Sequence, residues 1–356
     1  MLELKENLFA LLEETTKRGA SDLHITVGVP PIIRVNGNLE ALSDENYSVE
    51  DTKAVVSSIM SKDQLKTLDE KGQVDYSYSI HGKGRFRVNA YKQRGSYSMA
   101  CRLVGSEIPS LQELHLPNII HSLTQISKGL VLITGPTGSG KTTTLASMID
   151  IINHERSCHI LTLEDPIEYL HKHNKSMVNQ REIGYDTMDY GAGLRAALRQ
   201  DPDVILIGEM RDLETISIAL TAAETGHLVF STLHTVGSAK TIDRIIDVFP
   251  PHQQQQVRVQ LSTVLQGVIS QQLIPRQDQK GRIVALEVML ANPAIRNLIR
   301  EGKTHQINSI IQMSSKLGMT SMDSSLTELL SLGKISKENA LFYSLDQEIM
   351  RNKLAW

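Results

Sequence analysis

A phosphate-binding motif constrains this chain more than any other feature of its sequence. The motif reads G-x-x-x-x-G-K-T and runs from Gly135 to Thr142. An apolar run at 130–133 precedes it and a helix-like run at 143–149 follows it, which is the strand–loop–helix context that a P-loop requires. The alternative, a glycine-rich turn that matches by chance, explains neither the Lys–Thr pair nor the flanks. The sequence therefore predicts a nucleotide-binding domain.

The motif also predicts which residues contact the nucleotide. The expected binding residues are the loop and its next neighbour: Gly135, Pro136, Thr137, Gly138, Ser139, Gly140, Lys141, Thr142 and Thr143. Glycines allow the backbone to curl so that its N–H groups converge on phosphate oxygens. Lys141 is expected to neutralise the β- and γ-phosphates during catalysis, and the Thr142 hydroxyl is expected to ligate Mg²⁺. The predicted cofactors are ATP and Mg²⁺.

Length and composition indicate an ordinary soluble protein of about two domains. The chain has 356 residues, of which 40% are hydrophobic and 22% charged, and its net charge is −3. Such a chain has no global attraction to nucleic acid or acidic membranes. Its two cysteines, Cys101 and Cys158, cannot form a disulfide framework or a four-cysteine zinc site within one chain. A basic leader is missing near the N-terminus, and no apolar run reaches the ~18 residues of a membrane span. We expect a cytoplasmic protein without direct membrane insertion.

The pattern of apolar residues changes beyond about residue 125. Helical spacing predicts helices at 3–17 and 51–70, and alternation predicts strands between them and at 74–80, 85–91 and 97–103, which together suggest a small α+β domain with an antiparallel sheet. Prolines at 109 and 117 indicate a linker at 111–125. The predicted domains are therefore 1–110 and 126–356.

The second predicted domain has the pattern of an α/β core. Its buried parallel strands are predicted from short apolar runs that alternate with helices, at 130–134, 160–163, 204–207 and 228–233. From about residue 285 the chain is predicted to be helical to its end.

Two acidic segments follow predicted strands of this core. Residues 203–212 form an apolar strand that ends in Glu209, the Walker B arrangement, in which a carboxylate lies near Mg²⁺ and the attacking water. Residues 161–168 place Glu164, Asp165 and Glu168 just past a strand end. Glu164 is expected to be the base that orients or deprotonates water. Which glutamate is the base stays open. Asp165 and Glu168 have the alternative of being ordinary solvated loop acids, and for Glu168 the two interpretations are evenly balanced.

Histidines and arginines complete the set of candidate catalytic residues. His227 and His234 flank a predicted strand, and His234, at its carboxyl end, is expected to contact the γ-phosphate and report hydrolysis. A structural histidine is the alternative. Residues 85–102 carry arginines at 85, 87, 94 and 102 with no acidic residue among them. These arginines are either solvated or paired, or they clamp phosphate across a subunit boundary.

Taken in order, these segments resemble the Walker A, Asp, Walker B and His boxes of the GspE/PulE-like secretion ATPase superfamily. Residues 20–25, Ala-Ser-Asp-Leu-His-Ile, are also similar to its members. Residues 294–301, Ala-Ile-Arg-Asn-Leu-Ile-Arg-Glu, match the signature of the type IV pilus retraction ATPases, the PilT family. The similarity extends from about residue 5 to about residue 345.

This resemblance implies a PAS-like N-terminal domain, a RecA-like ATPase domain and a homohexameric ring that drives pilus retraction and twitching motility. It implies an inner-membrane pilus platform protein as partner, no nucleic acid, and a cytoplasmic protein docked at the inner-membrane pilus machine. It favours Arg94 and Arg102 as the arginines that act across subunits. Extension ATPases of this superfamily typically carry a four-cysteine zinc site. The two cysteines of this chain cannot form one, so the resemblance favours a retraction ATPase.

Two other functions are compatible with the same core. A nucleic-acid translocase is disfavoured by the pI of about 6.5 and by only 4% aromatic residues, which leave few platforms for base stacking. A scaffold that binds nucleotide without turnover is disfavoured by the intact boxes.

The retraction signature itself predicts an amphipathic helix at 292–301. Asn292 is a suitable N-cap and Pro293 suits the first helical position. Arg296 and Arg300, four residues apart, share a face separate from the apolar one. We interpret that face as the one that transmits motion to the pilus machinery or to an adjoining subunit.

Overall fold

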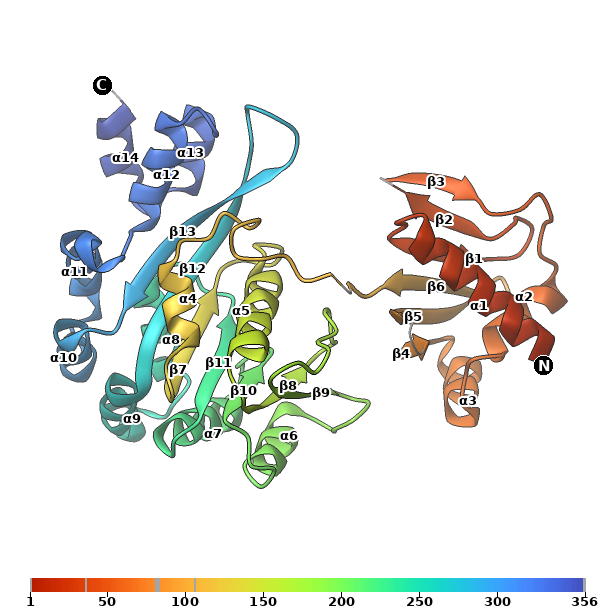
Figure 1. Cartoon of the computed structure of the whole chain (residues 1–356), viewed down its shortest axis with the longest axis horizontal. Helices are drawn as coiled ribbons and strands as arrows, with labels where there is room; N and C mark the ends of the chain where they lie inside the picture. Colours follow the sequence, from red (N-terminus) through yellow and green to blue (C-terminus); the bar gives the residue numbers. More distant parts are fainter. Residues whose placement is uncertain (1, 36, 81–83, 106, 355–356) are drawn as a thin grey trace. The chain divides into compact units, whose positions relative to one another are not determined.

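The computed structural model describes residues 2–35, 37–80, 84–105 and 107–354 (Figure 1). The chain divides into two compact units. The first extends to Glu107 and includes Glu168–Leu170, and the second contains Ile108–Ile167 and the chain from His171 onward. The segment expected as a linker at 111–125 belongs to the second unit. Its apolar residues, among them Ile120, are buried in that unit's core, so the prolines at 109 and 117 do not separate this segment from the domain that follows.

The described part of the first unit is a six-stranded antiparallel sheet with helices packed on one face (Figure 1). The strand order is β3-β2-β1-β6-β5-β4. Alternate strand residues such as Leu23 and Val88 face the helices and are fully buried. The elements are α1 (Leu2–Lys17), β1 (Asp22–Ile25), β2 (Ile32–Val35), β3 (Asn38–Ala41), α2 (Val49–Ser57), α3 (Lys62–Lys71), β4 (Gln73–Ile80), β5 (Gly84–Gln93) and β6 (Ser96–Leu103).

The single helix predicted at 51–70 is in fact two helices, α2 and α3. Each begins with a capping box: the Ser48 side chain accepts from the backbone N–H of Asp51, and that of Ser61 accepts from the N–H of Gln64. The Asp51 and Gln64 side chains accept in return from the backbone N–H groups of the two serines. The second box begins a new helix because it satisfies N–H groups that a continuing helix would have used.

The described part of the second unit is built on a seven-stranded sheet in the order β13-β12-β7-β11-β10-β8-β9 (Figure 1). All neighbouring strands are parallel except β13, which runs antiparallel to β12. The strands are β7 (Gly129–Thr134), β8 (His159–Glu164), β9 (Met177–Glu182), β10 (Val204–Ile207), β11 (Leu228–Leu233), β12 (Leu265–Pro275) and β13 (Arg282–Leu290).

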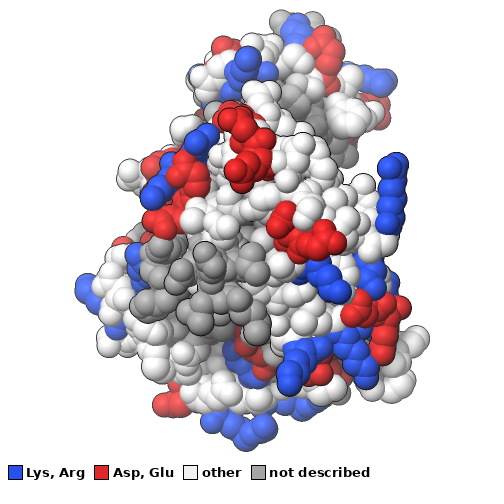
Figure 2. All heavy atoms as spheres, turned by 90° about the vertical axis from the view of Figure 1, so that its right-hand side faces the viewer, with Lys and Arg blue, Asp and Glu red and all other residues white. Residues whose placement is uncertain are grey.

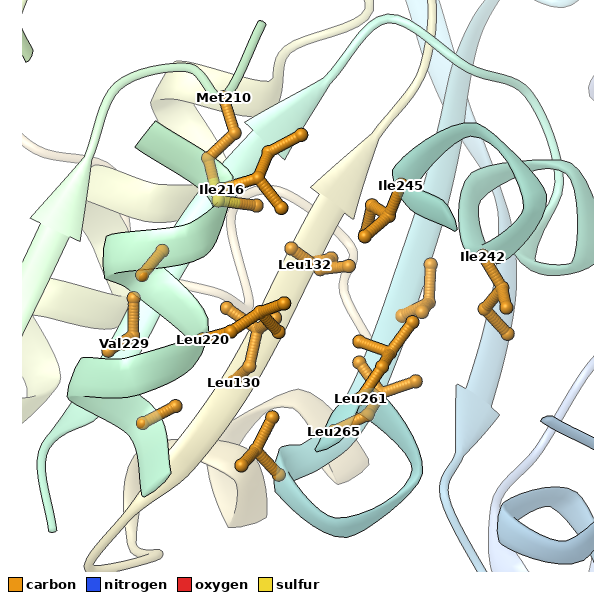
Figure 3. Packing of buried hydrophobic residues seen from close by; sticks show 14 of the residues in the cluster. Leu130, Leu132, Met210, Ile216, Leu220, Val229, Ile242, Ile245, Leu261 and Leu265 are labelled. Carbon is orange, nitrogen blue, oxygen red and sulfur yellow. The ribbon is translucent and has the colours of Figure 1, made fainter. Parts of the chain in front are cut away.

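Helices cover both faces of this sheet, which is why its central strands are apolar throughout. On β7, Leu130 and Leu132 belong to one core and Val131 and Ile133 to the other. The helices are α4 (Ile119–Thr124), α5 (Lys141–Glu155), α6 (Tyr190–Ala197), α7 (Leu213–Glu224), α8 (Ser238–Asp247), α9 (Pro251–Val264), α10 (Pro293–Glu301), α11 (Ile307–Met313), α12 (Met322–Ser331), α13 (Lys337–Tyr343) and α14 (Gln347–Leu354). Figure 3 shows the first core, where side chains of α7, α8 and α9 meet those of β7.

Three strands of this sheet were not predicted, and the expectation of helix from about residue 285 is wrong. β13 continues to Leu290, and the helical C-terminal part begins at Pro293. β9 is an edge strand of mainly polar residues, and β12 contains buried glutamines and a serine that break the apolar run. Polar residues of this kind remove the apolar pattern that predicts a strand. They are tolerated because residues of neighbouring elements contact them, and the local sequence does not show those contacts.

Charges of both signs are mixed on the face of the molecule that Figure 2 shows. Figure 2 shows Lys and Arg side chains interspersed with Asp and Glu side chains over the face in view, in keeping with the small net charge of −3. Within the described part of the chain, none of the helices combines the length and hydrophobicity that a membrane crossing requires.

The α10 helix begins and buries its apolar face as predicted. The Asn292 side chain caps it by accepting from the N–H of Ile295, and both Ile295 and Ile299 are fully buried. Arg296, however, does not share an outward face with exposed Arg300. Its guanidinium donates to the carbonyl oxygens of Ser262 (2.7 Å) and Thr263 (2.8 Å). These carbonyls belong to the last turn of α9, where helical acceptors need partners.

Arg296 is therefore a structural residue, and its loss is expected to weaken the fold. Arg296→Ala leaves two carbonyls at the end of α9 without their charged donor and should lower the free energy of unfolding by about 1.5–3 kcal/mol. Arg300→Ala, on the same helix, should change it by less than about 0.5 kcal/mol. Urea unfolding of the two variants measures the difference. Equal stabilities would show that the Arg296 contacts contribute nothing.

Candidate active site

Four neighbouring parallel strands of the second unit end at one edge of the sheet, and each carries a predicted site residue. β7 leads into the P-loop, and β11, next to it, leads into His234. β10 is followed by Glu209, and β8 ends at Glu164. Because the carboxyl ends of parallel strands meet at one edge, residues up to 100 positions apart form a single row there.

The P-loop has the backbone conformation that its glycines permit. Gly135, Gly138 and Gly140 have φ values of 141°, 75° and 88°. Gly135 has a second requirement, because an added Cβ would collide with the backbone carbonyl oxygen of Gln271 on β12. The Gln271 side chain also donates to the carbonyl of Ser139 at 2.6 Å. β12 thus supports the loop from one side.

Lys141 lies under the loop, at the first position of α5. Its ammonium donates to the carbonyls of Gly135 (2.9 Å) and Pro136 (3.0 Å), and the side chain is largely buried. The Ser139 hydroxyl is buried without a hydrogen-bond partner among the described residues. A buried cation and an unpaired hydroxyl beside an open glycine turn suit the phosphates of a nucleotide.

The two glutamates have different surroundings. Glu164 is 9% exposed, and its carboxylate accepts from the Thr162 hydroxyl at 2.6 Å and from the Gln180 amide at 3.1 Å. Glu209 pairs with the Arg211 guanidinium at 2.6 Å. Burial raises the pKa of Glu209, but the hydrogen bond from Arg211 and the nearby charges outweigh it, and the net shift is downward. Glu209 is therefore a carboxylate at neutral pH.

His234 connects the P-loop to the Walker B segment. Its Nδ1 lies 3.4 Å from the Thr137 hydroxyl, and its Nε2 lies 3.2 Å from the Glu209 carboxylate. His227, at the opposite end of β11, lies 2.9 Å from the carbonyl of Ala222 at the end of α7, which is a structural contact. The two histidines of this box thus have different positions, and only the one at the carboxyl edge lies beside the P-loop and Glu209.

The predicted arginines belong to the first unit. Arg102 on β6 pairs with Asp22 on β1 at 2.9 Å, and its side chain remains 71% exposed. Arg94 is exposed in the β5–β6 turn, where it has a φ of 49° and precedes Gly95. Their action on a nucleotide remains a prediction.

The site also contains residues for which the sequence predicts no role. Arg211 lies in the Walker B segment, two residues after Glu209, and this closeness in the sequence is a signal that it pairs with Glu209. Gln271 and Gln180 come from strands that were not predicted, and Tyr190 begins α6 without any motif. No signal in the sequence marks these three.

Comparisons with known proteins identify the family. Residues 3–340 match the family described as "Type II/IV secretion system protein". The "Type IV pilus retractation ATPase PilT" of Pseudomonas aeruginosa is 49% identical over 330 residues, covering 93% of this chain and 96% of that protein. This chain is a secretion ATPase of the PilT family. A "Twitching motility protein" of Neisseria gonorrhoeae is 48% identical over 320 residues, covering 90% of this chain and 86% of that protein.

A solved structure supports the same assignment. The crystal structure described as the pilus retraction motor PilT with bound ADP matches this PilT-family chain with a TM-score of 0.88 and 49% identity. The match covers 96% of this chain and 98% of that one. The mixed α/β fold and the ATPase activity predicted from the sequence are thereby confirmed, as is nucleotide binding.

Proposed function

We propose that this PilT-family ATPase is the motor that powers type IV pilus retraction, and hence twitching motility. The observation that carries the proposal is the 49% identity to the retraction ATPase over 93% of this chain, together with the P-loop, His234, Glu209 and Glu164 at one edge of this chain's sheet. A motor needs hydrolysis as well as binding, and the row supplies groups for both.

The residues of the row have complementary roles in hydrolysis. Lys141 moves from the loop carbonyls to the β- and γ-phosphates and stabilises the charge of the transition state. Glu164, held by Thr162 and Gln180, orients or deprotonates the attacking water. His234 couples the occupancy of the P-loop to Glu209 through Thr137, so that loss of the γ-phosphate changes the hydrogen bonding at the Walker B segment.

Thr142 and Glu209 are the residues that would hold Mg²⁺. No group of three or more metal-ligating side chains occurs in the described ranges. That fits Mg²⁺, which is usually held by one or two protein ligands together with substrate phosphates rather than by an all-protein cage. The ion supplies positive charge to the β- and γ-phosphates when it is bound.

The finer architecture belongs to the same proposal. The first unit is a PAS-like domain, supported by its antiparallel sheet with helices on one face, and the second is RecA-like, supported by the parallel core around the P-loop. The active protein is a homohexamer in the cytoplasm, docked on an inner-membrane platform protein of the pilus machine.

The test is deletion of the gene followed by fluorescence imaging of surface pili. We expect cells with many pili that never shorten. Reintroducing the native gene should restore shortening, whereas the Lys141→Ala gene should not. Cells without pili would indicate an extension motor, and unchanged pilus dynamics would reject a role in retraction.

An arginine that acts across subunits makes a prediction about mixed assemblies. Arg94→Ala and Lys141→Ala subunits should each be inactive alone and partly active when mixed. Recovery is expected because some interfaces then join an intact Arg94 to an intact P-loop. Phosphate release at several mixing ratios measures the effect.

The matched control mixes Lys141→Ala with Glu164→Gln subunits. Both residues lie in the second unit, so no arrangement of the two subunits gives a site with both groups unless sites are shared. Recovery in the first mixture alone supports Arg94 in trans. Absence of recovery, with subunit exchange verified by labelled subunits, argues against it, and Arg102→Ala is then tested in the same way.

A further inference from the structure

Tyr190 is held near the catalytic carboxylates by the start of α6. The Asp189 side chain caps this helix by accepting from the N–H of Ala192 at 2.7 Å. The next residues alternate as Gly191-Ala192-Gly193, and these glycines permit close packing. An added Cβ at Gly193 would lie 2.9 Å from a methyl of Leu163 on β8, and one at Gly191 would lie 3.0 Å from the Glu214 carboxyl carbon. The helix start therefore lies against the ends of the sheet strands.

The Tyr190 hydroxyl lies close to the place where the two strands that carry the glutamates end. A Cβ added at Gly208, the residue before Glu209, would lie 2.8 Å from the Tyr190 hydroxyl oxygen. The same point lies 3.2 Å from the carbonyl oxygen of Leu163 and 3.4 Å from the Cα of Glu164. The hydroxyl, the end of β8 and the end of β10 thus converge on one place, and only glycine at position 208 leaves room for them.

The surroundings of this hydroxyl are acidic. Burial raises the pKa of Tyr190, and the negative charges of Asp165, Glu209 and Glu164 raise it further. The phenol is therefore protonated throughout the physiological range and remains a hydrogen-bond donor.

No backbone or side-chain group in the described part of the chain accepts the hydrogen bond of the Tyr190 hydroxyl. Tyr190 lines a cavity of about 310 Å³ together with Asp165, Glu209 and Arg211, and this cavity is large enough for several waters.

We propose that Tyr190 is a positioning residue for ATP hydrolysis. Its hydroxyl donates a hydrogen bond into the cavity that Glu209 and Asp165 also line, one residue past Glu164, and orients a water there for hydrolysis. The close approach of the hydroxyl oxygen to Gly208 fixes the position of that donor. This inference rests on the proposed hydrolytic roles of the two glutamates.

Tyr190→Phe tests the inference because it removes the donor and keeps the ring. We expect kcat for ATP hydrolysis to fall on the order of tenfold, the effect of one hydrogen bond to charged or water-bound groups. KM for ATP and the thermal unfolding midpoint should stay within the error of the native protein, which separates positioning from a structural role. Tyr185→Phe is the matched control: that side chain is exposed on the preceding loop, and its kcat should not change.

A second variant tests the contact itself. Gly208→Ala adds a methyl group against the Tyr190 hydroxyl and should lower the unfolding midpoint. In the Tyr190→Phe background the oxygen is gone, so the same change should lower the midpoint less. Equal losses in both backgrounds would show that the hydroxyl does not lie against Gly208.

The inference and the proposed function fail in different ways. Normal kcat in Tyr190→Phe, with strongly impaired Glu164→Gln, overturns the positioning role alone. Normal kcat in both Glu164→Gln and Glu209→Gln overturns the hydrolytic roles on which it rests. A lower midpoint in Tyr190→Phe with unchanged kcat assigns the hydroxyl to stability.

Discussion

Replacing Lys141 with alanine is expected to reduce kcat for ATP hydrolysis on the order of a hundred- to a thousandfold, the effect of losing one strong electrostatic contact in the transition state. Lys141 donates to the carbonyls of Gly135 and Pro136, so its ammonium already lies inside the loop that receives the phosphates. Charge on the γ-phosphoryl group would develop without its main protein cation. Steady-state phosphate release measures the loss.

The fold should survive this change, and Lys128→Ala is the matched control. Lys128 is exposed and precedes β7 at the amino end of the strand, far along it from the P-loop. Its replacement should leave kcat unaltered. Near-normal phosphate release by a folded Lys141→Ala protein would reject the P-loop as the catalytic phosphate site.

The strands that were predicted correctly are those whose residues are buried in the core and have no further role. Strands β7, β8, β10 and β11 are apolar runs because helices bury them on both faces, and such runs are visible in the sequence. β12 has the opposite character. Its buried Gln271 supports the P-loop through a side-chain amide, so a functional contact interrupts the apolar pattern. A buried strand that also carries polar residues for such contacts lacks the apolar pattern from which strands are predicted.

The site was predictable where a motif joins neighbouring residues and not where the fold joins distant ones. Glu164, Glu209 and His234 were found because each follows a recognisable strand. The bridge from Thr137 through His234 to Glu209 depends on β11 lying between β7 and β10. The local sequence does not predict the order of the strands in the sheet. Arg296 shows the converse error: helical spacing placed it correctly on α10, but only the packing of α9 shows where its guanidinium goes.

Glu164→Gln and Glu209→Gln are expected to separate the base from the metal ligand. Glutamine at 164 can still accept from Thr162 and Gln180 through its amide oxygen, so the fold and ATP binding should be preserved. Its amide cannot take a proton from water, and kcat should fall by about 10²–10⁴-fold if Glu164 is the general base. Phosphate release and the binding of a fluorescent ATP analogue measure the two effects.

Glu209→Gln differs because Glu209 is an ionised carboxylate beside Arg211 and His234. Loss of that charge should weaken nucleotide binding in the presence of Mg²⁺ and leave binding in EDTA nearly unchanged, since only the metal-bound form uses the carboxylate. Glu155→Gln, at the exposed end of α5, serves as the control and should alter neither quantity. If Glu209→Gln instead binds Mg²⁺–ATP normally and fails only in turnover, Glu209 acts on the water and the two assignments exchange. Full activity in Glu164→Gln would remove Glu164 from the site, because its buried carboxylate at the end of β8 would then have a structural role, such as its contacts with Thr162 and Gln180.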